Sequence, residues 1–114
     1  MTTQEIANRM VHLCRNGEFV NAEEELYDAN IVHVEANGTE FKGFDAVLSK
    51  EKHFLKKLEG KPVIRVSEPI VAGDFFTLGM HMEFSHSELG AKILDEIVVY
   101  QVSNGKIVYL KCYF

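Results

Sequence analysis

Three side chains near the end of the chain are of types that could move protons: Glu96, Lys111 and Tyr113. They flank Asn104-Gly105, and Asn-Gly between two alternating β-branched runs is a strong signal for a two-residue hairpin turn. Such a turn places Glu96 opposite Tyr113 and Val98 opposite Lys111. A carboxylate in these apolar surroundings has a raised pKa, which suits a general base, and tyrosine could donate a hydrogen bond to a developing enolate. Alternatively, Glu96 and Lys111 form an ion pair at an exposed edge or a dimer seam.

A second polar pair, His33 and Glu35, lies two residues apart and therefore shares one face of a predicted strand. Asn37-Gly38 predicts a hairpin here as well. With a two-residue turn, Glu35 lies opposite Glu40, and His33 lies opposite Lys42. This polar pairing favours a solvent-facing position over a place on a pocket wall. A loop longer than two residues would change the register and weaken that interpretation.

Lys50 and His53 lie one turn apart on a predicted helix, beside its apolar stripe. Lys50 could reach a carboxylate on the sheet, although a surface lysine is favoured. The run from Phe76 to Phe84 places alternate apolar residues on one face, and Met80 and Met82 are among them. Core beneath the helices is the favoured interpretation, and the wall of a ligand pocket is the alternative, since thioethers adapt to irregular apolar shapes.

The candidate site can therefore be stated as one set. Glu96 and Tyr113 are the candidate catalytic residues. The candidate ligand-binding residues are His33, Glu35, Lys50, His53, Met80, Met82, Tyr100 and Lys111.

Metal and cofactor motifs are missing from the sequence. The histidines are scattered, with no HExxH and no tight Cys/His cluster. Cys14 and Cys112 have no CxxC spacing, and both lie on predicted apolar faces, so buried reduced thiols are expected. No glycine-rich phosphate loop occurs. We therefore predict neither a metal nor a cofactor.

Size and composition set the broad class. The chain has 114 residues, enough for one domain over 1–114, and it is 46% hydrophobic with 25% charged residues. A net charge of -5 argues against nucleic-acid binding, which requires a basic surface. Neither a signal peptide nor a membrane-length apolar run is visible, so a cytoplasmic protein that does not contact membranes is expected.

The elements that would position these residues follow from periodicity and turn signals. Helices are predicted after the Thr2 capping box, over about 19–27, and from Phe44 to the Gly60-Lys61-Pro62 stop. A hairpin over 31–43 separates the second and third helices. Strands over 63–72, 75–85, 96–102 and 106–114 form an antiparallel meander. This order predicts an α+β fold in which about six antiparallel strands curl around three helices, with a pocket between the long helix and the concave face.

Several strings along the chain, in this order, resemble one known family. They are Leu26-Tyr-Asp-Ala-Asn30 with Val32-His-Val-Glu-Ala36, Lys42-Gly-Phe-Asp-Ala46, Pro69-Ile-Val-Ala-Gly-Asp-Phe75, and Glu96-Ile-Val-Val-Tyr100 with Asn104-Gly-Lys-Ile-Val108. Together with Lys50 they resemble the SnoaL-like branch of the nuclear transport factor 2-like superfamily. The resemblance implies a cone-shaped α+β domain whose open end holds an apolar pocket. It also implies a homodimer that packs through the sheet.

The same resemblance guides the functional expectation. Relatives include polyketide cyclases, a ketosteroid isomerase and dehydratases that work by acid–base chemistry without cofactors, while others bind ligands or only mediate association. The chain departs from the family at Lys111 and Cys112, where relatives often carry an aromatic residue or a carboxylate. We expect a pocket protein that binds or acts on an apolar carbonyl-bearing molecule, by isomerisation, cyclisation or dehydration if it is an enzyme. A non-catalytic ligand-binding or dimeric association module is the alternative, and a transport adaptor is a weaker one.

Overall fold

The computed structural model describes residues 1–114 and contains three helices. α1 (Thr3–Arg15) begins at the predicted capping box: Thr2 Oγ1 accepts a hydrogen bond from the Glu5 N–H at 3.1 Å, and Glu5 Oε1 accepts one from the Thr2 N–H at 2.8 Å. α2 (Phe19–Leu26) and α3 (Phe44–Lys56) follow. No helix is long and apolar enough to cross a membrane.

The sheet has seven strands, joined in the order β2-β1-β7-β6-β5-β3, with β4 paired to β5. The strands are β1 (Tyr27–Val34), β2 (Glu40–Lys42), β3 (Leu58–Val66), β4 (Ile70–Ala72), β5 (Phe75–His86), β6 (Gly90–Ser103) and β7 (Lys106–Tyr113). The α+β class is confirmed, but the sheet is mixed because β1 pairs with β7 in parallel. The predicted strand over 63–72 is broken by a segment ending in Pro69, which has no N–H for a ladder.

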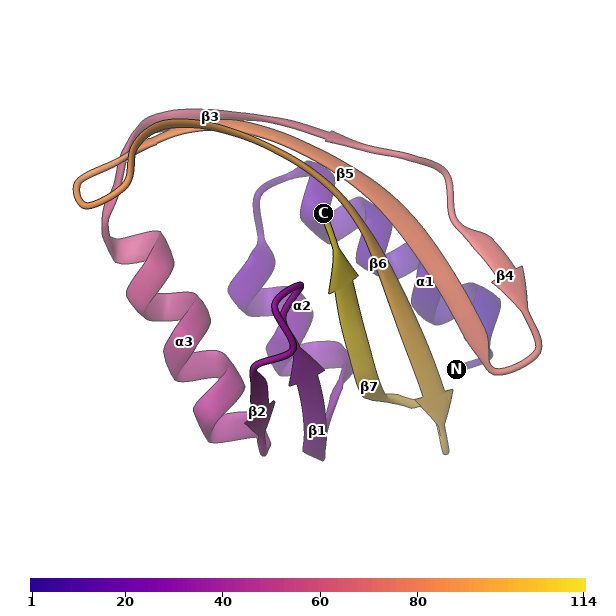
Figure 1. Cartoon of the computed structure of the whole chain (residues 1–114). Helices are drawn as coiled ribbons and strands as arrows, with labels where there is room; N and C mark the ends of the chain where they lie inside the picture. Colours follow the sequence, from indigo (N-terminus) through magenta and orange to yellow (C-terminus); the bar gives the residue numbers. More distant parts are fainter.

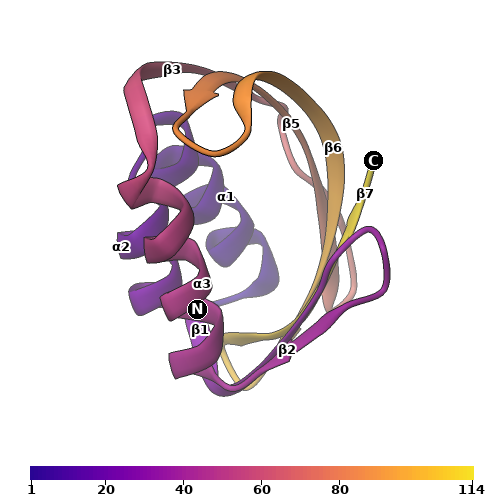
Figure 2. The ribbon, with the colours of Figure 1, turned by 60° about the vertical axis from the view of Figure 1, so that its left-hand side comes forward.

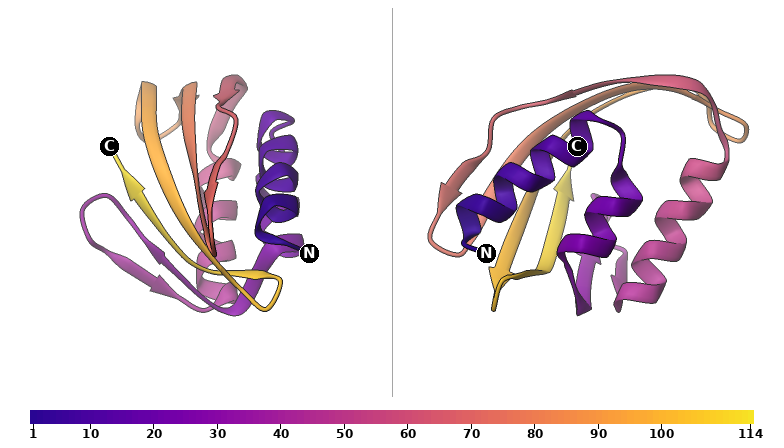
Figure 3. Two further views of the ribbon diagram at one scale, coloured as in Figure 1. Left: turned by 90° about the vertical axis from the view of Figure 1, so that its right-hand side faces the viewer. Right: turned by 180° about the vertical axis from the view of Figure 1, so that it is seen from behind.

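The helices lie on one side of the sheet, which curves around them without closing. Figure 2 shows the sheet arching over the three helices, and the rear view in Figure 3 shows α1 and α2 across its concave side. β5 and β6 are the longest strands and form the arch, while the β1–β2 hairpin and β7 complete the lower part of the wall (Figure 1). The core lies between the helices and this concave face, with Ile6, Leu26, Ile31, Phe76, Leu78, Ile107 and Leu110 among its most buried residues.

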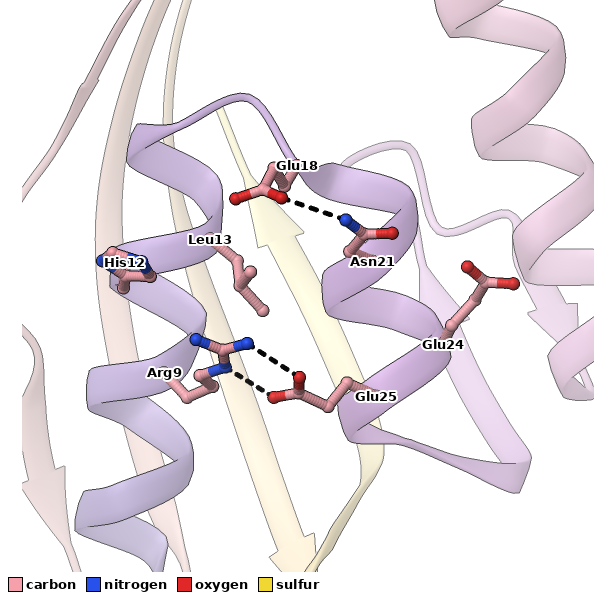
Figure 4. Close-up of a pocket in the computed structure, with 7 residues that line it drawn as sticks. All are labelled: Arg9, His12, Leu13, Glu18, Asn21, Glu24 and Glu25. Carbon is pink, nitrogen blue, oxygen red and sulfur yellow. Dashed lines mark hydrogen bonds and ion pairs between the residues drawn. The ribbon is translucent and has the colours of Figure 1, made fainter.

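A groove between α1 and α2 is polar and faces solvent (Figure 4). Arg9 joins the two helices through hydrogen bonds of 2.6 Å and 2.9 Å to the two carboxylate oxygens of Glu25. Asn21 donates a hydrogen bond to Glu18 at its other end. Arg9, the one arginine or lysine of the groove, is already paired with Glu25, so the groove ties the helices together and offers little to an anionic ligand.

The β6–β7 hairpin has the predicted two-residue turn but a different register beyond it. Asn104 and Gly105 have φ of 51° and 75°, and Ser103 pairs with Lys106, as a type I′ turn requires. Val102 then pairs with Ile107, whereas Gln101 pairs with Tyr109. One residue, Val108, is therefore extra on β7 and forms a β-bulge, which moves every later residue of β7 by one position.

The bulge shows that the predicted pairing of Glu96 with Tyr113 is wrong. Tyr113 pairs with Ile97 instead, and Val99 pairs with Lys111, so both Lys111 and Tyr113 are on the outer face of the sheet. Leu110 and Cys112 turn inward and are buried. The predicted ion pair between Glu96 and Lys111 is excluded for the same reason, because the two side chains lie on opposite faces.

The β1–β2 hairpin also departs from the predicted register, because its loop has three residues. Glu35 donates its N–H to the Thr39 carbonyl at 2.8 Å, and the Gly38 N–H bonds back to the Glu35 carbonyl at 2.9 Å. Gly38, with φ of 90°, supplies the positive dihedral that this loop needs. His33 consequently pairs with Phe41, not Lys42, and shares the inward face with Leu110 on β7.

The bulge makes a testable prediction about stability. Leu110 is 2% exposed and Tyr109 is 37% exposed, whereas an unbroken ladder would exchange their faces. Leu110→Ala should lower the free energy of unfolding by about 2–5 kcal/mol because it leaves a cavity in the core. Tyr109→Ala should cost far less. Urea denaturation of the two variants measures both values, and the reverse order would contradict the bulge.

Candidate functional site

A cavity of about 570 Å³ lies between α2, α3 and the concave face of the sheet. Of its 24 lining residues, 17 are hydrophobic, so its character is apolar. Met80, Met82 and Phe84 of β5 form part of the wall, whereas Phe76 and Leu78 of the same stripe are buried in the core. The stripe is thus core at the start of β5 and cavity wall toward its end, so each of the two interpretations holds for one part of the strand.

Polar side chains from three elements meet on the sheet side of the cavity. Lys50 Nζ of α3 lies 2.9 Å from Glu35 Oε1, and His33 Nε2 lies 3.4 Å from Glu35 Oε2. The Cys112 thiol of β7 lies 3.8 Å from His33 Nε2. His33 and Glu35 therefore belong to the cavity wall and not to the solvent-facing surface that a two-residue turn predicted. Lys50 does reach a carboxylate on the sheet.

Glu96 faces the same cavity from β6, where it pairs with Met80 of β5. Burial raises the pKa of Glu96 to about 7, and the negative charge of Glu35 adds to the effect. The positive charge of Lys50 and a hydrogen bond from the Cys112 thiol oppose this rise. Near neutral pH the Glu96 carboxyl is therefore balanced between its acid and its base form, as proton transfer in both directions requires.

The pKa of Glu35 is shifted in the opposite direction from that of Glu96. Burial acts to raise the pKa of Glu35, but the hydrogen bond and charge of Lys50 outweigh it, so the pKa lies below its usual value. The pKa of His33 is lowered, first by burial and then by Lys50, and the imidazole is neutral at pH 7. The cavity thus holds two carboxyl groups whose pKa values are pushed apart, which is the pattern of an acid–base site.

Two further carboxyl groups, Glu23 of α2 and Glu51 of α3, line the helix side of the cavity. Burial raises the pKa of Glu23 to about 8, with a further contribution from Glu51, and burial also raises the pKa of Glu51. Glu23 is 7% exposed, and its Oε1 has no hydrogen-bond partner. Burying such a group without a partner is costly, so these side chains are exceptions to the rule for a core.

Sequence reasoning missed Glu23, Glu51 and Cys112, although a signal exists for the two glutamates. In α2, Glu23 is at position i+4 of the stripe that starts at Phe19 and continues with Ala22 and Leu26. Glu51 has the same relation to Val47 and Phe54 in α3. A carboxylate within an apolar helical stripe points at the core or at a cavity. Cys112 is buried and free, as the sequence predicted, but its position beside His33 on the cavity wall could be placed only by knowing of the bulge.

The remaining predicted residues divide between the two faces of the wall. Tyr100, Met80 and Met82 line the cavity together with Lys50 and Glu96. His53 is exposed, because it lies about 60° around the helix from Lys50, on the side away from the inward stripe of Val47, Glu51 and Phe54. Lys111 is also outside, with its Nζ 5.2 Å from the centroid of the Tyr113 ring.

His33, Glu35 and Cys112 are the side chains that could hold a metal, since their donor atoms lie within 4.8 Å of one another. The fold assembles this group from β1 and β7, although no tight cluster occurs in the sequence. However, the Lys50 ammonium already bonds to Glu35, and burial together with Glu96 raises the pKa of Cys112 to about 12. A metal ion would need the deprotonated thiolate of Cys112. The arrangement therefore favours a hydrogen-bonded network of side chains over a metal centre.

Comparison with known proteins places this fold and cavity in a family. The SnoaL-like domain model matches residues 1–114, and the chain belongs to the SnoaL-like family, within the nuclear transport factor 2-like superfamily as the sequence motifs predicted. No functionally curated protein is significantly similar to it.

Solved structures agree on the fold. A suspected SnoaL-like polyketide cyclase from Mesorhizobium loti is 28% identical, with a TM-score of 0.92 and full coverage of both chains. A protein of ketosteroid isomerase-like fold from Catenulispora acidiphila, solved with trimethylamine, is 15% identical with a TM-score of 0.76, covering 99% and 87%. An epoxide hydrolase from M. tuberculosis is 11% identical with a TM-score of 0.75, covering 98% and 81%. The last two support the fold alone.

The raised pKa of Glu23 makes stability depend on pH. Because the folded-state pKa of about 8 exceeds the ordinary value of 4.5, the contribution of Glu23 to stability is full below pH 4.5 and is lost as the pH rises through 8. Glu23→Gln stays neutral, so its free energy of unfolding relative to the native protein should rise by about 2–4 kcal/mol between pH 5 and pH 9. Urea denaturation at several pH values measures this difference. Glu24→Gln, an exposed neighbour, is the control, and an equal response of the two variants would contradict the assignment.

Proposed function

We propose that this protein binds an apolar carbonyl-bearing molecule in the cavity and catalyses a cofactor-independent proton transfer, with Glu96 as the general base. The observation that carries the proposal is the pair Glu96 and Glu35, two carboxyl groups facing one apolar cavity whose surroundings set their pKa values apart. A base poised near pH 7 and a partner kept ionised by Lys50 match the needs of enolisation.

The reaction step follows from this geometry. Glu96 removes a proton from the carbon next to the carbonyl, and the electrons of that C–H bond move into an enolate. The Lys50 ammonium has three donors and uses one on Glu35, so another can stabilise the enolate oxygen. In a substrate with a β,γ double bond the enolate extends over that bond, so return of the proton from Glu96 to the γ-carbon shifts the double bond next to the carbonyl and completes an isomerisation. Lys50 thus takes the role of hydrogen-bond donor to the enolate, which the sequence analysis had given to Tyr113.

The family setting supports the same class of activity without naming the substrate. The Mesorhizobium loti protein is described as a suspected SnoaL-like polyketide cyclase, with carbohydrate phosphatase as a second description, and the first of these is in keeping with acid–base chemistry on a carbonyl compound. An apolar cavity excludes water, which strengthens the charge effects on Glu96 and protects the enolate. We also propose that this activity takes place in the cytoplasm.

The role of Glu96 can be tested before the natural substrate is known. Exchange of α-protons for deuterium in a panel of apolar cyclic ketones, followed by NMR, reports enolisation directly. Glu96→Gln should reduce the exchange rate by about 100-fold or more, because a positioned base contributes that much. In the native protein the rate should rise with pH through about 7, as Glu96 loses its proton.

Asp95→Asn serves as the matched control, because Asp95 is adjacent on β6 but points to the outer face, where it contacts His81. It should leave the exchange rate unchanged. Full exchange activity in Glu96→Gln would remove the catalytic proposal and favour the non-catalytic binding module.

We also propose that the chain forms a homodimer through the outer face of the sheet. Large apolar side chains are exposed there in neighbouring strands: Val63, Ile93, Ile97 and Tyr113. Ile97 pairs with Tyr113, and Ile93 and Val63 both flank Glu83, so the four residues belong to one surface. Large exposed apolar side chains gathered on one face, here interspersed with Glu83 and Asp95, are typical of an interaction site. His81 lies on the same face, between Asp95 and Glu83.

A charge on this face should prevent association. Ile97→Glu should shift the mass measured by light scattering after size-exclusion chromatography from dimer to monomer, since burying an unpaired carboxylate is costly. Ile70→Glu, at a more exposed side chain on β4 outside this group of four residues, should remain dimeric. A native protein that is monomeric at high micromolar concentration would overturn the dimer proposal.

A further inference from the structure

The helix side of the cavity holds a pair of carboxyl groups that the enolisation step does not use. Glu23 and Glu51 come from neighbouring helices, and Glu51 is close enough to contribute to the raised pKa of Glu23. Glu23 lines the helix side of the cavity from α2 and Glu96 lines the sheet side from β6, while Glu51 is near enough to both to affect their pKa values. Glu23 is more than nine-tenths buried, and its Oε1 has no hydrogen-bond partner.

No side chain of the protein supplies the missing partner. Lys50, the nearest cation, lies 2.9 Å from Glu35 and is engaged by it. Neither Glu23 nor Glu51 forms an ion pair with any lysine, arginine or histidine of the chain. A buried acceptor that faces a cavity and lacks a donor is satisfied when a bound molecule brings the donor.

We propose that Glu23 and Glu51 form a subsite for a protonated amine, so that the molecule bound in this cavity carries an ammonium group on an apolar body. An ammonium supplies several N–H donors and the positive charge that two adjacent carboxylates require. The ammonium end of the ligand is inferred from Glu23 and Glu51 alone. The carbonyl end, which would meet Glu96, rests on the proposed function. Together the two ends define an amino ketone as the substrate class.

The surroundings of the pair suit a cation more than a neutral hydroxyl group. Phe19 and Tyr27 line the cavity beside Glu23, and Phe54 lines it one helical turn from Lys50 and Glu51. Aromatic faces attract alkylammonium groups in sites shielded from water. An anionic ligand would meet repulsion beside the two glutamates, because Lys50, the cation that acts on both, is already held by Glu35.

Binding should release protons, which gives a second readout. Glu23 keeps its proton near neutral pH in the empty protein, and an arriving ammonium favours the ionised form. The titratable groups that surround Glu23 from the neighbouring elements are Glu51 and Lys50 of α3, Cys14 of α1, Tyr27 of β1 and Tyr100 of β6. Burial raises the pKa of Cys14, Tyr27 and Tyr100 far above 7, so these three stay neutral.

The experiment uses three probes that share one ring and differ in charge: cyclohexylmethylamine, cyclohexylmethanol and cyclohexanecarboxylate. Calorimetric titration of the full-length protein at pH 7.5 should show the amine binding at least about tenfold more tightly than the alcohol, as a charge-assisted hydrogen bond predicts. The carboxylate should bind more weakly than either. Titration in two buffers of different ionisation enthalpy should show proton release with the amine and none with the alcohol.

Glu23→Gln should remove the tenfold preference for the amine, and Glu24→Gln should keep it. Equal binding of amine and alcohol by the native protein, no amine binding, or a preference that survives Glu23→Gln would each overturn the subsite. These results leave the enolisation proposal standing, because ketone exchange by Glu96 is measured separately. Conversely, full deuterium exchange in Glu96→Gln together with an intact preference for the amine would retain the subsite and reject the proposal that Glu96 is the general base.

Discussion

One extra residue in β7 decides what the interior of this protein contains. The bulge at Val108 lets Ile107 stay in the core near the turn while Leu110 and Cys112 also face inward. Without it, Lys111 would enter the cavity and Cys112 would leave. Because β1 pairs with β7 in parallel, the same shift fixes the face on which His33 lies. The polar side of the cavity therefore depends on a local irregularity of one ladder.

The sequence predicted the elements well because their signals are local. The capping box at Thr2 and the type I′ turn at Asn104-Gly105 each act within a few residues, and the structure confirms them. The parallel pairing of β1 with β7 joins segments almost eighty residues apart. Such pairing leaves no short-range signal, so the sheet could not be predicted as mixed.

The site was predicted in part, and the errors share a cause. Glu96, His33, Glu35 and Lys50 line the cavity, whereas Tyr113, Lys111 and His53 do not. Two wrong registers account for most of the difference, because a shift of one residue moves a side chain to the opposite face. The pattern did contain a clue: inward Leu110 and Cys112 with outward Lys111 fit only if a residue is inserted after Ile107.

The Lys50–Glu35 ion pair has a mechanical meaning beyond its effect on charge. It joins α3 directly to the end of β1, on the two sides of the cavity. α3 can move away from the sheet only if this half-buried pair separates, and a separated pair leaves two poorly hydrated charges. The ion pair therefore holds α3 against the sheet and keeps the cavity closed on that side. Bulky molecules would enter and leave slowly, and salt would change those rates only weakly, because a sheltered pair is poorly screened.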